Sequence, residues 1–145
     1  MKKTLPVLFV ALLVTAFFAY VSQAQMPQKG SKNTVTLPNG DVIWDLNGEW
    51  DARVENYGSW SSFGSYSAAV KMTQTGSYFE GVRTVGGHSI GASETLQGEL
   101  DKNGFNWVQI NTMAGPLDAK VHMSEDGNKM VIDDGVKARV TYVRK

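Results

Sequence analysis

Apolar and polar residues alternate with a period of two along most of the chain after Gly48. Alternation of this kind is typical of β-strands that bury one face and expose the other. Some runs alternate cleanly, whereas those near 78–85, 105–112 and 129–133 are less regular. The pattern predicts eight strands, at about 49–56, 66–74, 78–85, 95–101, 105–112, 117–124, 129–133 and 136–144.

The breaks between these runs are short and contain glycine, as in Gln74–Ser77, Asp101–Gly104, Ser124–Asn128 and Asp133–Gly135. Short links of this kind join antiparallel neighbours, because parallel strands need long crossovers. Eight antiparallel strands joined in sequence predict an all-β fold, an up-and-down (meander) barrel. The alternative is a sheet or sandwich with Greek-key connections, which requires at least one long return. A barrel of this size is either filled by its own side chains or holds one small ligand.

The first 24 residues differ from the rest, with 17 apolar residues and only two charges, Lys2 and Lys3. The segment ends in Ser22-Gln23-Ala24, a small-x-small cleavage pattern. Together these features predict a signal peptide over residues 1–24 and a secreted or periplasmic location. The alternative is an uncleaved anchor, since Leu5–Val21 is near the short limit for crossing a bilayer. After signal cleavage we expect no membrane span.

The remaining 121 residues have 12 Lys and Arg against 14 Asp and Glu. This balance excludes a strongly basic nucleic-acid-binding protein. The absence of cysteine excludes a disulfide scaffold, a thiolate metal site and a cysteine nucleophile. We expect residues 25–47 to form a flexible leader, with a short hairpin around Pro38-Asn39-Gly40, and residues 48–145 to form the barrel.

The motif Gly48-Glu49-Trp50 opens the first long strand, and the last strand is rich in basic residues. This combination resembles the Gly-x-Trp signature of lipocalins and their avidin-like relatives, the calycin group. In that group the tryptophan closes one end of the barrel and a basic residue of the last strand packs over it. The resemblance therefore implies that Arg139 or Arg144 stacks on Trp50, and it leaves open which of the two. The chain lacks the disulfide and the C-terminal helix of most lipocalins, and it has no biotin-site pattern.

An aromatic residue recurs at every third position of 57–66, as Tyr57, Trp60, Phe63 and Tyr66, with only Gly and Ser between. In lipocalin-like barrels this connection covers the open mouth, so the resemblance implies a lid. We predict that these four residues contact a ligand, and two alternatives are a hydrophobic plug and a partner-binding patch.

The glycine-rich loop 86–94 follows the third strand and contains His88. In a meander, the first and third connections lie at the same end of the barrel. His88 is therefore a further candidate ligand contact, and the alternative is a solvated loop histidine. His88 and His122 are separated and have no cysteine partner, so we expect no metal or cofactor.

Catalysis is not expected, because no nucleophile, base and orienting group share a motif. The carboxylates of Glu80, Glu94 and Glu99 are candidates for a glycosidase-like pair, but nothing in their spacing requires one. In strand 105–112, Phe105 and Trp107 alternate with Val108 and Ile110, which predicts an apolar outward face. Such a face implies either a homodimer contact or a cover formed by the leader or hairpin.

Five positions predicted to face inward carry small residues: Ala52, Ala68, Gly98, Ala119 and Ala138. Small inward residues leave unfilled volume in a barrel, which favours a ligand-binding interior. We predict an exported, non-enzymatic binding protein that holds a small, mostly apolar ligand in the barrel mouth. One alternative is that the larger inward side chains fill the barrel. Another is a surface-acting interaction or inhibitor module that uses loop 57–66 or the Phe105/Trp107 face.

Overall fold

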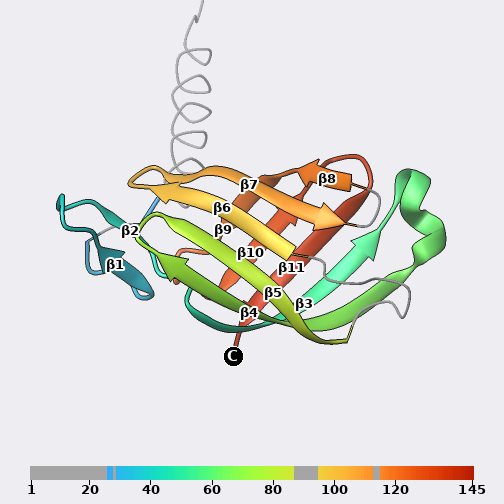
Figure 1. Ribbon diagram of the computed structural model, residues 1–145, viewed down its shortest axis with the longest axis horizontal. Helices are drawn as coiled ribbons and strands as arrows, with labels where there is room; N and C mark the ends of the chain where they lie inside the picture. The colour runs from blue at the N-terminus through green and yellow to red at the C-terminus, as the bar shows by residue number, and fades with distance from the viewer. Residues whose placement is uncertain (1–25, 28, 87–94, 113–114) are drawn as a thin grey trace, which may run out of the picture.

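The computed structural model describes residues 26–27, 29–86, 95–112 and 115–145 (Figure 1). The predicted signal peptide and His88 therefore lie outside the described residues. A short 3-10 helix, η1 (Gly58–Phe63), follows the first strand of the barrel. The strands are β1 (Thr34–Thr36), β2 (Val42–Trp44), β3 (Gly48–Asn56), β4 (Ser65–Thr75), β5 (Tyr78–Gly86), β6 (Thr95–Asp101), β7 (Gly104–Thr112), β8 (Gly115–Asp118), β9 (Lys120–Met123), β10 (Lys129–Asp133) and β11 (Ala138–Arg144).

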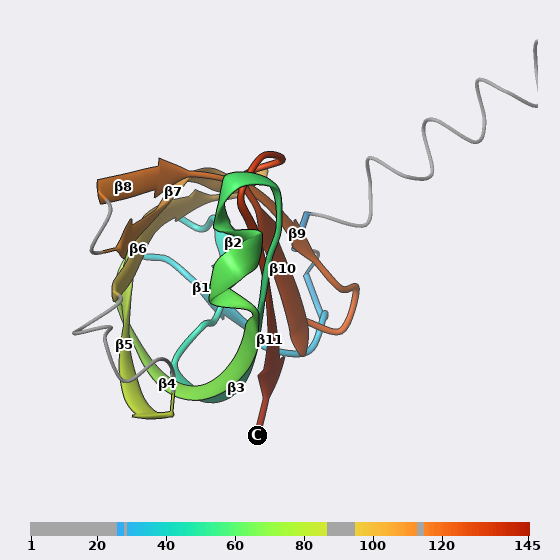
Figure 2. The same ribbon diagram turned by 90° about the vertical axis from the view of Figure 1, so that its right-hand side faces the viewer.

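One antiparallel sheet contains all strands from β3 to β11, in the spatial order β8-β7-β6-β5-β4-β3-β11-β10-β9. The segments β8 and β9 are two halves of one strand, interrupted at Ala119. The first half pairs with β7 and the second with β10, so the sheet curls until its two ends meet (Figure 2). The result is a nearly closed, eight-stranded antiparallel barrel with its strands in sequence order. The predicted meander barrel is confirmed, and the Greek-key alternative is wrong.

The barrel is sealed at one end, which we call the closed end, by a hairpin that precedes it. In this hairpin β1 pairs with β2, and Thr34 lies opposite Trp44. Ile43, Trp44 and Leu46 are fully or almost fully buried. The side chain of Asn33 donates to the main-chain oxygen of Asp126 at 2.7 Å, which ties the hairpin to the β9–β10 turn. The hairpin thus forms the floor of the barrel core.

A β-bulge changes which side chains of β7 face the core. The register between β6 and β7 shifts at Glu99 and Leu100, so that Leu100 lies opposite Phe105 and Glu99 lies opposite Trp107. Phe105 therefore faces inward, and its ring packs edge-on against Phe79 with 5.9 Å between the ring centroids. The prediction that Phe105 and Trp107 share an outward face is wrong, because the bulge inserts one residue between them.

The predicted free volume beside Gly98 is also absent. A Cβ atom on Gly98 would lie 2.7 Å from two ring carbons of Phe79 and 2.5 Å from the main-chain oxygen of Trp107. The glycine therefore makes room for the Phe79 ring, which is completely buried. In this part of the barrel a small residue allows a large one to pack, and no space remains for a ligand.

Candidate functional site

The closed end is organised around Trp50, whose side chain is completely buried. The indole Nε1 donates to the main-chain oxygen of Leu46 at 3.0 Å. On its other side, the guanidinium carbon of Arg144 lies 4.4 Å from the ring centroid, a cation–π distance. Arg144 also donates from Nη1 to the main-chain oxygen of Asn47 at 2.7 Å and from Nη2 to that of Asp45. Burial lowers the pKa of Arg144 from its ordinary value.

Of the two basic residues that the family resemblance left open, Arg144 occupies the position over Trp50. Arg139 points to the outer surface, where its Nε lies 2.8 Å from the Asp133 carboxylate. The difference follows from strand parity, because Arg144 lies directly opposite inward Trp50 and Arg139 lies opposite exposed Glu55. These contacts hold the closed end shut.

At the opposite end, which we call the mouth, small inward side chains lie beside the larger Tyr66 and Ile132. Inward residues of the closed end, such as Phe79, Met123 and Met130, have no exposed surface. Towards the mouth, Val54, Ala68, Ala138 and Val140 keep 5–7% of their surface exposed. Burial does not change steadily along the barrel, because Ile132, opposite Val140, has no exposed surface, whereas Val70, opposite Trp50, keeps 8% of its surface exposed.

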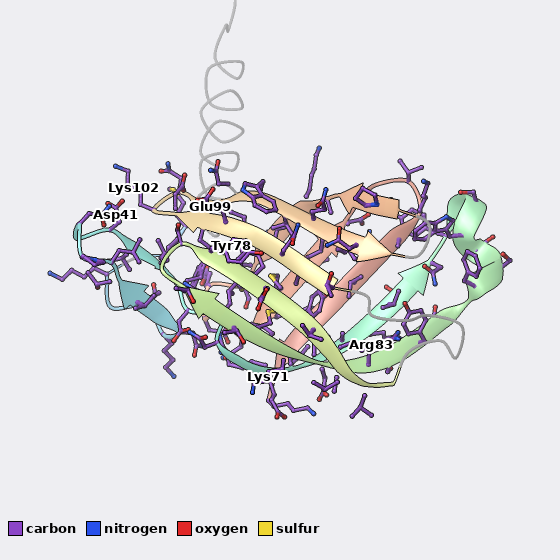
Figure 3. All side chains as sticks on the ribbon, in the orientation of Figure 1. Asp41, Lys71, Tyr78, Arg83, Glu99 and Lys102 are labelled. Carbon is purple, nitrogen blue, oxygen red and sulfur yellow. The ribbon has the colours of Figure 1, made fainter. Side chains whose placement is uncertain are left out.

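One charged side chain, Arg83 on β5, faces the interior in the half of the barrel nearer η1 (Figure 3). It lies opposite Val70 in the β4–β5 ladder, and side chains directly opposite each other share one face of a sheet. Val70 is buried in the core, so the Arg83 side chain is directed inward, and its Nη1 atom is shielded from solvent. Arg83 is not among the site residues that the sequence pattern predicts. The available signal was its shared parity with inward Phe79 and Gly81.

The aromatic loop forms η1 at the rim of the barrel (Figure 2). None of the η1 residues is buried, and Phe63 keeps 53% of its surface exposed, so Trp60 and Phe63 do not form a buried plug. Trp60 packs edge-on against Phe63, with ring centroids 6.1 Å apart. The Nζ atom of Lys137 lies 5.3 Å from the Trp60 ring centroid. The loop thus rests on the β10–β11 connection rather than filling the mouth.

Tyr57 fastens this loop to the end of β10. Its hydroxyl donates to the Asp133 carboxylate and lies 3.4 Å from that of Asp134. The hydrogen bond to Asp133 is the main cause that raises the pKa of Tyr57 to about 12. The same bond is the main cause that lowers the pKa of Asp133. Tyr57 therefore acts as a clip between the rim and the wall of the barrel, whereas the sequence pattern predicts a ligand contact for it.

Asp134 holds the turn on which the loop rests. Burial alone would raise the pKa of its carboxyl group, but hydrogen bonds from the main-chain N–H groups of Ala138, Lys137 and Val136 lower it. These bonds measure 3.0, 2.7 and 2.9 Å. The main-chain N–H of Tyr57 in turn donates to the main-chain oxygen of Lys137 at 2.8 Å. Loop and turn are thus a single hydrogen-bonded unit.

The residues predicted to contact a ligand therefore lie in different parts of the barrel. Tyr66 faces inward opposite Val54 and is half-buried, whereas Trp60 and Phe63 lie on the rim. Tyr57 is committed to the aspartates of β10 and its turn, and His88 is outside the described residues. Of the four candidates that the structure describes, Tyr66 is the one on the inner wall.

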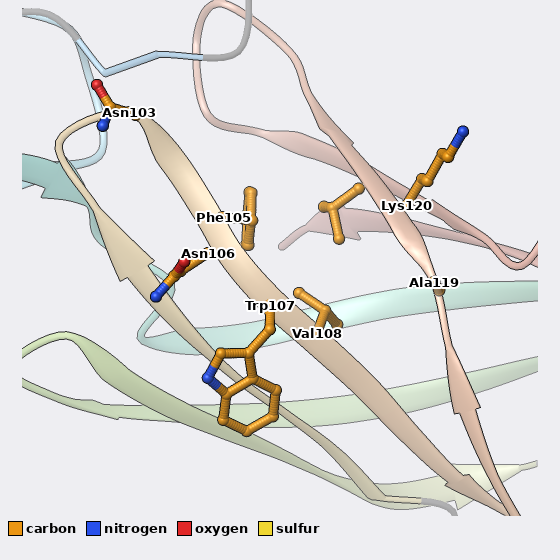
Figure 4. A pocket seen from close by; sticks show the side chains of 8 residues that line it. Asn103, Phe105, Asn106, Trp107, Val108, Ala119 and Lys120 are labelled. Atoms are coloured by element: carbon orange, nitrogen blue, oxygen red, sulfur yellow. The ribbon is translucent and has the colours of Figure 1, made fainter.

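A surface groove of about 360 Å³ opens where β7 and β9 part (Figure 4). The ladder of β7 with β8 covers only Gln109–Thr112, and β9 pairs with β10. In the part of the chain that the structure describes, no ladder joins Gly104–Val108 to Lys120–Met123. The lining residues are Asn103, Phe105, Asn106, Trp107, Val108, Ala119, Lys120 and Val121.

Comparison of the chain with protein families, curated proteins and solved structures finds no match. The barrel and its strand order are compatible with a calycin-like fold. Within the described ranges, no three His, Asp or Glu side chains gather closely enough to hold a metal ion. The same residues contain no helix long and apolar enough to cross a membrane.

Proposed function

We propose that this chain is an exported, non-enzymatic binding protein that holds a small, mostly apolar molecule in the mouth of its barrel. The observation that carries the proposal is the presence of small inward side chains at the end beside η1. Ala68 and Ala138 face inward there, whereas Phe79, Met123 and Met130 fill the closed end. A concave, mainly apolar site with few polar groups is the usual form of a small-molecule site.

Arg83 places a guanidinium group on this inner wall, opposite Val70. Tyr66 supplies a second polar group on the same inner wall. Membership of the lipocalin or avidin-like families is part of this proposal and rests on the Gly48-x-Trp50 motif and the Trp50–Arg144 contact.

Titration with an anilinonaphthalene sulfonate dye, which has an apolar ring system and one anionic group, tests the proposal. Ala68 and Ala69 are neighbours on β4, and only Ala68 belongs to the buried core. We expect saturable binding to the wild type, about tenfold weaker binding to Ala68→Leu, and unchanged binding to Ala69→Leu. Thermal unfolding checks that both variants are folded. Absence of binding, or equal binding by both variants, would overturn the proposal.

A further inference from the structure

The outer face of β5, β6 and β7 carries an ordered grid of side chains. The ladders place Tyr78, Glu99 and Trp107 in one row across the three strands. A second row contains Glu80, Gln97 and Gln109, and a third contains Val82, Thr95 and Asn111. We call these nine residues the β5–β7 outer face. It lies on the outside wall of the barrel, so neither the mouth nor the interior site uses it.

Two large aromatic side chains are exposed on this face. Tyr78 keeps 40% of its surface accessible and Trp107 keeps 42%. They lie on strands separated by one strand, β6, so about 9.5 Å of sheet lies between them. Most of a soluble protein's large aromatic surface is buried, and an exposed aromatic pair therefore indicates a binding surface.

Hydrogen bonds hold both aromatic side chains in place and leave them exposed. The Trp107 Nε1 donates to Glu99 Oε2 at 3.2 Å. The Tyr78 hydroxyl donates to Gln97 Oε1 at 3.5 Å. Both acceptors belong to β6, so the two rings lean toward the central strand; Figure 3 shows Tyr78 and Glu99 next to each other. Rings held in this way lose little conformational freedom when a ligand stacks on them.

The rest of the face consists mainly of uncharged groups that both donate and accept hydrogen bonds. The Gln97 amide donates to Gln109 at 3.2 Å, and the Asn111 amide donates to Thr95 at 3.1 Å. The nine residues include two carboxylates, Glu80 and Glu99, and no Lys or Arg. Such a surface disfavours phosphate polymers, and its amide rows disfavour a lipid surface.

We propose that the β5–β7 outer face binds a β-linked polysaccharide of pyranose units. A pyranose ring has an apolar C–H face and a rim of hydroxyl groups. Tyr78 and Trp107 stack against the C–H faces of two sugars, and Gln97, Glu99 and Gln109 bind the hydroxyl groups between them. The spacing across β6 suits a flat ribbon polymer, in which alternate sugars present equivalent faces.

Retention of the folded protein on insoluble cellulose, chitin and peptidoglycan sacculi tests this proposal. We expect retention on at least one of the three polymers. Tyr78→Ala and Trp107→Ala should each weaken it at least about fivefold, because each removes one stacking platform. Trp107→Phe keeps an aromatic ring and should retain most of the binding. Val143→Ala, at an exposed apolar position on β11, is the matched control and should bind as the wild type does.

Retention on none of the polymers would overturn the proposal, and so would wild-type retention by folded Tyr78→Ala and Trp107→Ala. The result is independent of the interior site. Ala68→Leu should leave retention on the polymer unchanged, and Trp107→Ala should leave dye binding unchanged. Failure of one proposal is therefore distinguishable from failure of the other.

Discussion

Arg144 lies directly opposite Trp50 where the last strand of the barrel pairs with the first, and its guanidinium carbon is 4.4 Å from the Trp50 ring centroid. The same guanidinium group binds two main-chain oxygens of the segment that leads from the hairpin into β3. One side chain thus joins the hairpin, the first strand and the last strand. This contact holds one end of the barrel closed.

Replacing Arg144 should weaken the closed end measurably. Arg144→Met keeps the length of the side chain but removes the cation–π contact and two charge-assisted hydrogen bonds. We expect the free energy of unfolding to fall by about 3 kcal/mol, as measured by urea denaturation. Arg139→Met removes only an exposed ion pair and should have little effect. Equal effects of the two substitutions would contradict the role assigned to Arg144.

The Tyr57 clip should make stability fall at alkaline pH. The pKa of Tyr57 is raised to about 12 from the ordinary value of 10, so the folded state holds the phenolic proton more tightly than the unfolded state does. The contribution of Tyr57 to the free energy of unfolding is therefore complete below pH 10 and is lost as the pH rises through about 12.

Tyr57→Phe should lower the free energy of unfolding by about 1 kcal/mol at neutral pH, since it removes the hydrogen bond to Asp133. It should also flatten the alkaline decline in urea titrations made over this range. A decline of the same size in wild type and variant would show that another group causes it.

Two glycines provide a matched test of how the hairpin seals the barrel. Gly76 and Gly127 both lie in strand–strand turns with positive φ, at +61° and +68°. A Cβ atom on Gly76 would meet nothing within 4 Å, whereas on Gly127 it would lie 3.1 Å from two ring carbons of Trp44. Gly76→Ala should lower the free energy of unfolding by about 1 kcal/mol, from backbone strain alone.

Gly127→Ala should lower the free energy of unfolding by about 1–3 kcal/mol more than Gly76→Ala does, because the added Cβ atom also presses on the Trp44 ring. Hydrogen exchange should show faster opening of β1 and β2 in Gly127→Ala than in Gly76→Ala. Unaltered exchange in both strands would mean that the turn does not hold the hairpin.

The bulge in the β6–β7 ladder predicts opposite effects at two aromatic residues. Phe105 packs on the buried Phe79 ring, so Phe105→Ala should lower the free energy of unfolding by about 2–3 kcal/mol. Trp107 is exposed, so Trp107→Ala should change the free energy of unfolding by less than about 1 kcal/mol. Thermal or urea unfolding measures both. Similar losses at both positions would indicate that the two side chains share one face.

The strand ranges could be predicted from the sequence because one buried face per strand imposes strict alternation. The clean alternation over 66–74 and 95–101 places two strands where β4 and β6 lie. The family resemblance also predicted that a basic residue of the last strand contacts Trp50. The resemblance left Arg139 and Arg144 open, and the structure selects Arg144, which shares the parity of inward Val140 and Tyr142.

The site itself was less predictable, since small local irregularities decide which side chains face inward. The bulge beside Glu99 directs the Phe105 side chain toward the core. No residue type in this segment predicts a bulge. The inward direction of Arg83 was hidden because a charge at an inward position breaks the apolar pattern. The Tyr57–Asp133 bond joins residues 76 positions apart, a relationship that local periodicity does not contain.

The central claim is that the barrel carries a small molecule in its mouth, and native mass spectrometry of protein isolated from its own host tests it most directly. We predict a wild-type mass that exceeds that of the chain by a small molecule, which denaturation releases. Ala68→Leu purified in the same way should carry little or none of it. A native wild-type mass equal to that of the chain alone, or one raised only by a second protein chain, would contradict the account.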